Sequence, residues 1–190
     1  GIFGLPQTGK KTIFKLLTGT HPAAGSGNVT GVAPVRDDRF DRLVAMYKPK
    51  SAVNARLDIV LLPKIEADSI QSGAIFKDIA TMDALCHVVR AFNDDSVYHV
   101  SGSVDHLRDI ESVNGELMLH DLVFIEKRME RIDHARKKKG DKSLDQEEAV
   151  LIKCREHLEQ NLHLRTMEFS DEDKKLLSGY PLVTRKRMLL

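Results

Sequence analysis

The sequence has 190 residues, enough for one domain with a full hydrophobic core and a smaller inserted element. Charged residues make up 30% of it, and their signs nearly cancel to a net charge of +1, which excludes a global attraction to nucleic acid or to an anionic membrane. With two distant cysteines, no signal-peptide pattern and no long apolar span, the sequence favours a reduced, cytoplasmic setting without membrane insertion.

The first predicted unit is a strand, a glycine-rich loop and a helix. Residues 1–3 are apolar and form the end of a predicted buried strand, and apolar positions within 11–17 predict a helix. Between them, Gly4 and Gly9 lie five residues apart and Lys10 follows. This spacing is typical of a loop that binds phosphate through backbone N–H groups, a helix N-terminus and a lysine ammonium.

One residue of this loop departs from the pattern of phosphate loops that also bind Mg²⁺. In that pattern the residue after Lys10 is Ser or Thr, whose hydroxyl binds Mg²⁺, and here it is Lys11. A cation therefore occupies the position of an expected metal ligand. The candidate phosphate-binding residues are Gly4, Pro6, Gln7, Thr8, Gly9, Lys10, Lys11 and Thr12. The alternative is a turn that only supports the fold.

The next hundred residues alternate between loops, helices and apolar runs. Residues 20–31 are rich in Gly, Ala, Ser and Asn without periodicity, which predicts a mobile loop. A short strand is expected over 32–35, a helix over 37–47 and a strand over 57–62. The predicted helix carries one apolar face, formed by Phe40, Leu43, Val44 and Tyr47.

A second helix–strand pair supports an α/β fold. A helix is predicted over 69–81, and 84–89 is the clearest buried strand, followed by a turn at 93–95. Strands that alternate with helices predict a parallel sheet. Cys86 and His87 adjoin in this strand and are interpreted as ordinary core residues. The other histidines lack the spacing of metal ligands, so no metal site is predicted.

The segment that follows predicts two long amphipathic helices. The first spans 104–136, and the second begins after Lys137-Lys138-Lys139-Gly140. Their apolar stripes are Leu122, Ile125, Met129 and Ile132 on the first helix and Leu144, Leu151, Leu158 and Leu162 on the second. Two such stripes joined by a short turn predict an antiparallel helical hairpin. The hairpin is either simple packing or a lever or docking arm, and its lysine tip is either a solvated turn or a contact for RNA phosphate.

The last elements are short. Ser170 followed by three acidic residues predicts a capped helix start over 170–177. Residues 187–190 resemble a strand cut at its beginning, and the chain opens within a strand that is already under way. We therefore expect that the native start is missing.

In this order, the elements and motifs resemble the YchF subfamily of Obg-like P-loop GTPases and ATPases over almost the whole chain. The motifs that carry the resemblance are 1–6, 31–35, 37–43, 83–92, 102–105 and 108–111. The resemblance implies a P-loop NTPase (G-domain) three-layer sandwich with a mostly parallel sheet and an inserted antiparallel helical hairpin. It places the G domain at 1–115 and 166–190 and the hairpin at 116–165. It also implies that the chain is an amino-terminal portion, with a base-recognition motif and a TGS domain beyond Leu190.

Three motifs depart from the family pattern, at four positions. The family has Ser at position 11, a switch Thr near Gly25, and an Asp-x-x-Gly that would begin at position 61. Here these positions hold Lys11, Gly25, Leu61 and, in place of the motif glycine, Lys64. Every inferred Mg²⁺ and γ-phosphate sensor is therefore changed, so Mg²⁺ is expected to bind poorly.

Two functions stay open at this point. The first is a nucleotide-binding protein for GTP, ATP or the diphosphates, linked to the ribosome or translation, with Mg²⁺-dependent hydrolysis weak or lost. The second is a pseudo-GTPase that acts as a non-catalytic scaffold for protein or RNA. The resemblance implies ribosomal RNA contacts through the hairpin and the region beyond Leu190, and no membrane partner. The choice between guanine and adenine is expected to lie beyond Leu190 as well.

Overall fold

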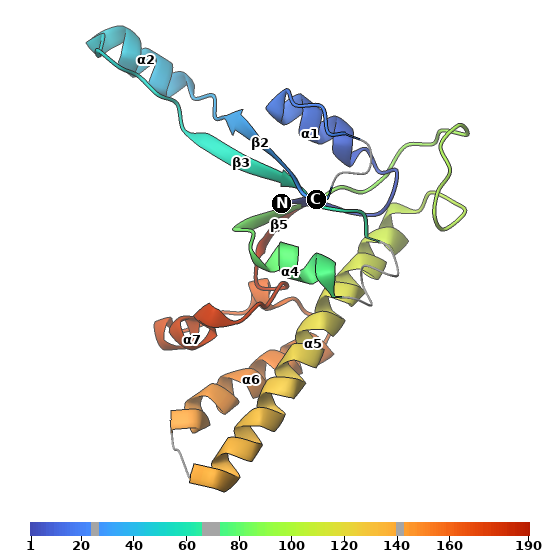
Figure 1. The fold of residues 1–190 in the computed structure, drawn as a ribbon, viewed down its shortest axis with the longest axis vertical. Helices are drawn as coiled ribbons and strands as arrows, with labels where there is room; N and C mark the ends of the chain where they lie inside the picture. Colours follow the sequence, from blue (N-terminus) through green and yellow to red (C-terminus); the bar gives the residue numbers. More distant parts are fainter. Residues whose placement is uncertain (24–26, 66–72, 140–142) are drawn as a thin grey trace.

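The computed structural model describes residues 1–23, 27–65, 73–139 and 143–190, with the backbone alone for 137–139 and Ser143 (Figure 1). The strands are β1 (Ile2–Phe3), β2 (Val29–Pro34), β3 (Arg56–Leu61), β4 (Ala84–His87) and β5 (Arg187–Leu189). The helices are α1 (Lys10–Thr18), α2 (Asp38–Tyr47), α4 (Ala74–Ala80), α5 (His106–Lys139), α6 (Ser143–Glu159) and α7 (Asp171–Leu176). Short 3-10 turns span Leu164–Thr166 and Leu177–Gly179.

The five strands form one sheet in the order β2-β3-β1-β4-β5. Among the described strands, β2 and β3 pair in an antiparallel direction, and the three other pairings are parallel. This confirms the predicted α/β fold with a mostly parallel sheet. Because parallel strands end at the same edge, the segments that follow β1, β3 and β4 meet there.

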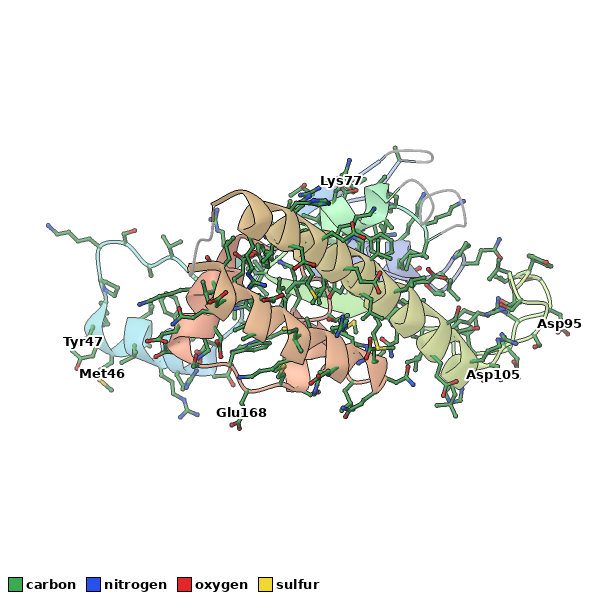
Figure 2. The ribbon with its side chains drawn as sticks, turned by 90° about the horizontal axis from the view of Figure 1, so that it is seen from below. Met46, Tyr47, Lys77, Asp95, Asp105 and Glu168 are labelled. Carbon is green, nitrogen blue, oxygen red and sulfur yellow. The ribbon has the colours of Figure 1, made fainter. Side chains whose placement is uncertain are left out.

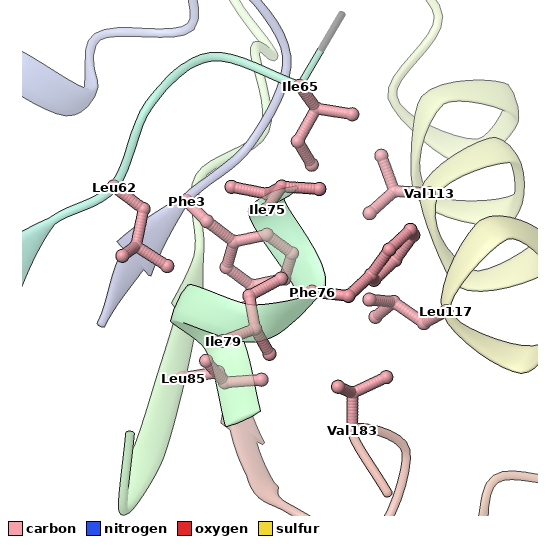
Figure 3. Packing of buried hydrophobic residues seen from close by; sticks show 10 residues of the cluster. All are labelled: Phe3, Leu62, Ile65, Ile75, Phe76, Ile79, Leu85, Val113, Leu117 and Val183. Carbon is pink, nitrogen blue, oxygen red and sulfur yellow. The ribbon is translucent and has the colours of Figure 1, made fainter. Parts of the chain in front are cut away.

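The sheet is covered on both faces because successive strand residues point in opposite directions. Ile2 packs with Phe14 of α1 on one face. Its neighbour Phe3 packs on the other face, against α4 and the first half of α5 (Figure 3). This second cluster contains Phe3, Leu62, Ile65, Ile75, Phe76, Ile79, Leu85, Val113, Leu117 and Val183. The layers agree with the predicted three-layer sandwich.

Helices α5 and α6 form the predicted antiparallel hairpin (Figure 1). Its core contains Ile125, Ile132, Leu151 and Leu158 from the two predicted stripes, and Leu122, Met129 and Leu144 pack against them. The prediction is wrong for Leu162, which follows α6 and is 42% exposed. The helix ends earlier because Asn161 adopts a left-handed φ of 59° and the Leu162 N–H bonds to the His157 carbonyl.

Helix α5 is continuous through residues 115 and 116, where the predicted hairpin insertion begins. The domain boundaries therefore stay a prediction. Among the described residues, no helix combines the length and the apolar character that crossing a bilayer requires.

Strand β2 begins at Val29, three residues before the predicted start. The reason is its partner: β2 pairs with β3 over six residues, from Val29 opposite Leu61 to Pro34 opposite Arg56. Gly, Ser and Asn on either side of Val29 and Thr30 hid the start of a strand that pairing with β3 defines. Residues 24–26 of the predicted mobile loop and 69–72 of the predicted helix lie outside the described residues.

Helix α2 has the predicted start, with the Asp37 carboxylate accepting from the Arg39 N–H as an N-cap. Its apolar face, however, is not buried: α2 has no buried residue, and Tyr47 is 73% exposed. Helix α2 and residues 49–53 line an open hollow of about 410 Å³. Figure 2 shows Met46 and Tyr47 at one end of the molecule and Asp95 and Asp105 at the other. The predicted amphipathic face exists without a partner among the described residues.

Candidate phosphate-binding site

The glycine-rich loop lies at the edge of the sheet where the parallel strands end. It connects β1 to α1 and is fixed from both sides by neighbouring segments. The Ile65 N–H donates to the Gly4 carbonyl at 3.4 Å, and the Val88 N–H donates to the Phe3 carbonyl at 2.9 Å. The ends of three strands therefore hold the loop in place.

Two glycines of the loop have conformations that other residues disfavour. Gly4 has φ +146°, and a Cβ there would lie 2.4 Å from the Val88 carbonyl oxygen. Gly9 has φ +93° and caps α1 without a side-chain hydrogen bond, and the first turn of α1 has no acidic residue. No side chain caps the first N–H groups of α1 or offsets the positive end of its helix dipole, which would favour an anion there.

Lys10 is the most enclosed cation of the loop, only 7% exposed. Its Nζ donates to the Gly4 carbonyl at 2.9 Å and also to the Leu5 carbonyl. Thr8, also buried, donates from Oγ1 to the same Leu5 carbonyl at 3.1 Å. These bonds place a positive charge inside the loop, where a phosphate oxygen would be held.

The remaining loop residues are more accessible. Pro6 is half-buried, and Gln7 is exposed with a left-handed φ of 58°. Lys11 and Thr12 are both exposed in the first turn of α1. The Lys11 ammonium lies 3.4 Å from the Ala23 carbonyl, to which it donates. Lys11 therefore contacts the chain that leads toward β2.

The three predicted switch positions lie in different environments or outside the described residues. Gly25 lies outside the described residues. Leu61, 5% exposed, packs with Ile2, Phe14 and Val88 and is a core residue. Lys64 is exposed and immediately precedes Ile65, whose N–H bonds to Gly4. The backbone beside Lys64 therefore lies next to the loop, whereas the Leu61 side chain is packed in the core.

These side chains do not fit the Mg²⁺ ion that a P-loop implies. Mg²⁺ takes oxygen ligands in an octahedral arrangement, and neither Lys11 nor Leu61 offers an oxygen from its side chain. Within residues 1–23, 27–65, 73–139 and 143–190, no group of three His, Cys, Asp or Glu side chains could hold a metal ion. Among the described residues, the loop offers lysine side chains and backbone N–H groups, which suit an anion better than a metal ion.

A buried polar cluster of His87, His99 and Asp109 adjoins the loop. The sequence did not predict this cluster, because His87 was interpreted as an ordinary core residue. His87 is 2% exposed at the end of β4, where its ring stacks on Phe3 with centroids 4.9 Å apart. Burial, and after it the Lys10 ammonium, lowers the pKa of His87 to about 4, whereas Asp109 opposes this shift. Asp109 lies 2.9 Å from His99 Nε2 and 2.9 Å from an Arg108 nitrogen. The cluster connects the loop to the first turn of α5.

Arg90 organises the segment between β4 and α5. Although it follows an apolar strand, its guanidinium is buried and donates to the carbonyls of Phe92, Asp94 and Val97 at 2.9–3.1 Å. The segment around it lines a hollow of about 510 Å³. An arginine directly after a buried apolar run was the available signal, because burying a guanidinium requires several acceptors.

The chain is similar in sequence to known proteins over nearly all of its length. No family model matches the chain. It is 35% identical over 199 residues to the ribosome-binding ATPase YchF of Bacillus subtilis, covering 100% of this chain and 54% of that protein. It is also 35% identical over 196 residues to Obg-like ATPase 1 of Caenorhabditis elegans, covering 98% of this chain and 50% of that protein.

A solved structure gives the same result at the level of the fold. The YchF GTPase of Schizosaccharomyces pombe superposes with a TM-score of 0.81 at 29% identity, covering 100% of this chain and 54% of that chain. The chain thus spans about half the length of the curated relatives that it matches.

Proposed function

The chain belongs to the family of the ribosome-binding ATPase YchF and Obg-like ATPase 1, and on that basis we propose that it binds a purine nucleotide through the loop from Gly4 to Thr12. GTP, ATP and the corresponding diphosphates are the candidate ligands. The observation that carries the proposal is the buried Lys10, whose ammonium is held by two loop carbonyls beside the uncapped start of α1. A buried cation and a helix N-terminus at one point favour a phosphate group.

We expect Mg²⁺-dependent hydrolysis to be weak or lost. Phosphoryl transfer in P-loop proteins depends on a metal that bridges the β- and γ-phosphate oxygens and on groups that position water. Lys11 and Leu61 provide no metal ligand, and loss of one preorganised stabilising contact commonly raises a barrier by ~3 kcal/mol. Binding depends on other groups of the loop and is retained in this proposal.

An association with the ribosome in the cytoplasm is part of the same proposal. Its support is the name of the bacterial relatives, which are ribosome-binding ATPases, together with 34–35% identity to them across the chain. The hairpin of α5 and α6 is the element proposed for contact with ribosomal RNA. Co-sedimentation of the chain with purified 70S ribosomes tests it, and a chain that stays in the supernatant at low salt would contradict it.

The second candidate function is a non-catalytic scaffold for protein or RNA. Its specific support is the loss of side-chain oxygen ligands at Lys11 and Leu61, together with Lys64 in place of the motif glycine. In a scaffold, the loop would be only a structural turn. The two candidates differ in whether the chain has saturable affinity for nucleotides.

The deciding experiment is a calorimetric titration with GTP, ATP, GDP and ADP, run beside an assay of phosphate release. We expect saturable binding that Lys10→Ala weakens roughly tenfold or more, because charge-assisted hydrogen bonds to phosphate are lost. Lys15→Ala is the matched control, since it removes an exposed lysine from the last turn of the same helix.

Two outcomes would change the conclusion. If none of the four nucleotides binds, the scaffold function replaces the proposal. If phosphate release requires Mg²⁺ and disappears in Lys10→Ala but not in Lys15→Ala, the chain is an active hydrolase and the expected loss of hydrolysis is wrong.

A further inference from the structure

We propose that the outer end of the arm formed by β2, α2 and β3 is a docking site for an acidic peptide segment of a partner protein, with apolar anchor residues in that segment. The site consists of the apolar face of α2 and of residues 48–57, which follow it. The inference is independent of the proposed nucleotide binding, because the site shares no residue with the loop from Gly4 to Thr12.

The first observation is an apolar hollow at this end of the molecule. The hollow measures about 410 Å³ and lies between the apolar face of α2 and residues 49–53. Around it, Leu43, Tyr47 and Val53 are 53%, 73% and 66% exposed. Apolar side chains that are exposed together commonly mark an interaction site, and a hollow of this size can take anchor side chains of a partner.

The position of α2 rules out its own fold as the reason for this apolar face. Helix α2 lies beyond the pairing of β2 with β3, away from the helices that cover the sheet (Figure 1). Among the described residues, none of the three buried hydrophobic clusters includes a residue of α2 or of 48–57. Packing within the described part of the chain therefore does not account for the apolar face.

The second observation is the charge beside the hollow. Residues 43–57 contain Lys48, Lys50 and Arg56 and no Asp or Glu. All three are exposed, and within the part of the chain that the structure describes their charged groups have neither an ion pair nor a hydrogen bond. The acidic residues that flank this stretch in the sequence, Asp41 and Asp58, pair with none of them. This end of the arm is therefore both apolar and cationic.

Charge complementarity identifies the partner as acidic. Carboxylates of a peptide would meet Lys48, Lys50 and Arg56, while apolar side chains of the same peptide would fill the hollow. RNA fits less well, because aliphatic residues such as Leu43 and Val53 offer bases neither stacking nor hydrogen bonds.

Two other occupants also fit less well. A second copy that used the same patch in a twofold interface would bring the cations of both copies together, which is repulsive. An anionic membrane binds apolar side chains that insert into it, whereas here the apolar residues line a hollow that a flat surface cannot fill.

The experiment measures the fluorescence anisotropy of three labelled peptides of equal length, titrated with the chain at low ionic strength. The first peptide repeats Asp-Phe-Glu-Leu, the second has Lys in place of its acidic residues, and the third has Ser in place of Phe and Leu. We expect saturable binding of the first peptide, roughly tenfold tighter than that of either other peptide. Added salt should weaken this binding, because exposed charges are screened.

Two variants separate the charged and the apolar parts of the site. Lys50→Glu should weaken binding of the first peptide roughly fivefold or more, whereas Lys77→Glu makes the same change at an exposed position of α4 and should not. Tyr47→Ser should weaken it to a similar extent. Tyr98→Ser is the matched control, since the two tyrosines are 73% and 72% exposed. Circular dichroism checks that each variant is folded.

Several results would overturn the inference. It is wrong if the first peptide does not bind, if the three peptides bind equally, or if each variant behaves as its control does. Tighter binding of single-stranded poly(U), or of vesicles containing phosphatidylserine, that Tyr47→Ser and Lys50→Glu weaken would assign the site to RNA or to a membrane instead. A dimer in sedimentation velocity that Tyr47→Ser abolishes would assign it to a second copy. None of these measurements uses a nucleotide, so the proposed function stands or falls separately.

Discussion

At the scale of single residues, His87 links the loop from Gly4 to Thr12 to the stability of the fold. Its pKa falls from 6.5 to about 4 in the folded chain because the ring is buried beside Lys10. The unfolded chain therefore takes up a proton first as the pH falls. This protonation lowers the free energy of unfolding as the pH falls from 6.5 to about 4, by roughly 3 kcal/mol in total. Above pH 6.5, His87 is neutral in both states and has no such effect.

The test is the free energy of unfolding in urea, measured at several pH values across this range. His87→Gln should lower the slope of stability against pH, whatever its effect on the absolute value. His134→Gln changes an exposed histidine of α5 and should leave the slope unchanged. Equal slopes in the unmodified chain and His87→Gln would contradict the assignment.

The same residue shows what a sequence conceals at this scale. Gly4, Gly9 and Lys10 are predictable because a phosphate loop needs them at fixed spacing within one short segment. His87 is predictable only as a core residue, since its neighbours Lys10 and Asp109 lie far away in the chain. Polar clusters built across strands leave no local pattern.

At the scale of elements, two amphipathic helical units with similar patterns have opposite environments. In the hairpin, Leu151 is fully buried, whereas Leu43 on α2 is 53% exposed. Leu151→Ala should reduce the free energy of unfolding by about 2–5 kcal/mol because it leaves a cavity. Leu43→Ala should change it by less than about 1 kcal/mol, since little apolar area is returned to water.

Urea denaturation of both variants checks this contrast, with the m-value showing whether the transition remains two-state. A loss for Leu43→Ala as large as that for Leu151→Ala would mean that the face of α2 is covered in solution. The two positions carry the same substitution, so each is the control of the other.

Element types were predictable where one pattern repeats, as in the two stripes of the hairpin, and the helix start at Ser170 was predictable from its capping residue. The ends of a strand that depend on a partner strand could not be predicted, as the start of β2 at Val29 shows. A hydrophobic stripe predicts which side of a helix is apolar, and the example of α2 shows that it does not predict that anything covers that side.

At the scale of the whole molecule, one carboxylate fastens the hairpin to the sheet. Asp121 of α5 is fully buried and accepts hydrogen bonds from the Val183 N–H, the Thr184 N–H and the Thr184 hydroxyl at 2.6–2.9 Å. Residues 183–184 lead into β5 at the edge of the sheet. The position of α5 is therefore tied to the last strand.

Asp121→Asn should lower the free energy of unfolding by about 3 kcal/mol, because an amide cannot accept all three bonds and faces a buried donor with its own N–H groups. Thermal and urea unfolding measure the loss. Asp133→Asn makes the same change at an exposed position of α5 and should have little effect. A loss as small as that of Asp133→Asn would show that the three bonds contribute little.

The unbroken course of α5 has a mechanical consequence. Its 34 residues rise 1.5 Å each and give a rod about 51 Å long. Val113 and Leu117 pack the beginning of α5 against the cluster that contains Phe3 (Figure 3), while Ile132 lies in its last ten residues and packs in the hairpin core. Rotation of the packed end by one degree displaces the other end by roughly 0.9 Å, as follows from that length. Rotations of α5 too small to disturb the packing around Leu117 would thus be visible as ångström-scale movements of the last turn of α5.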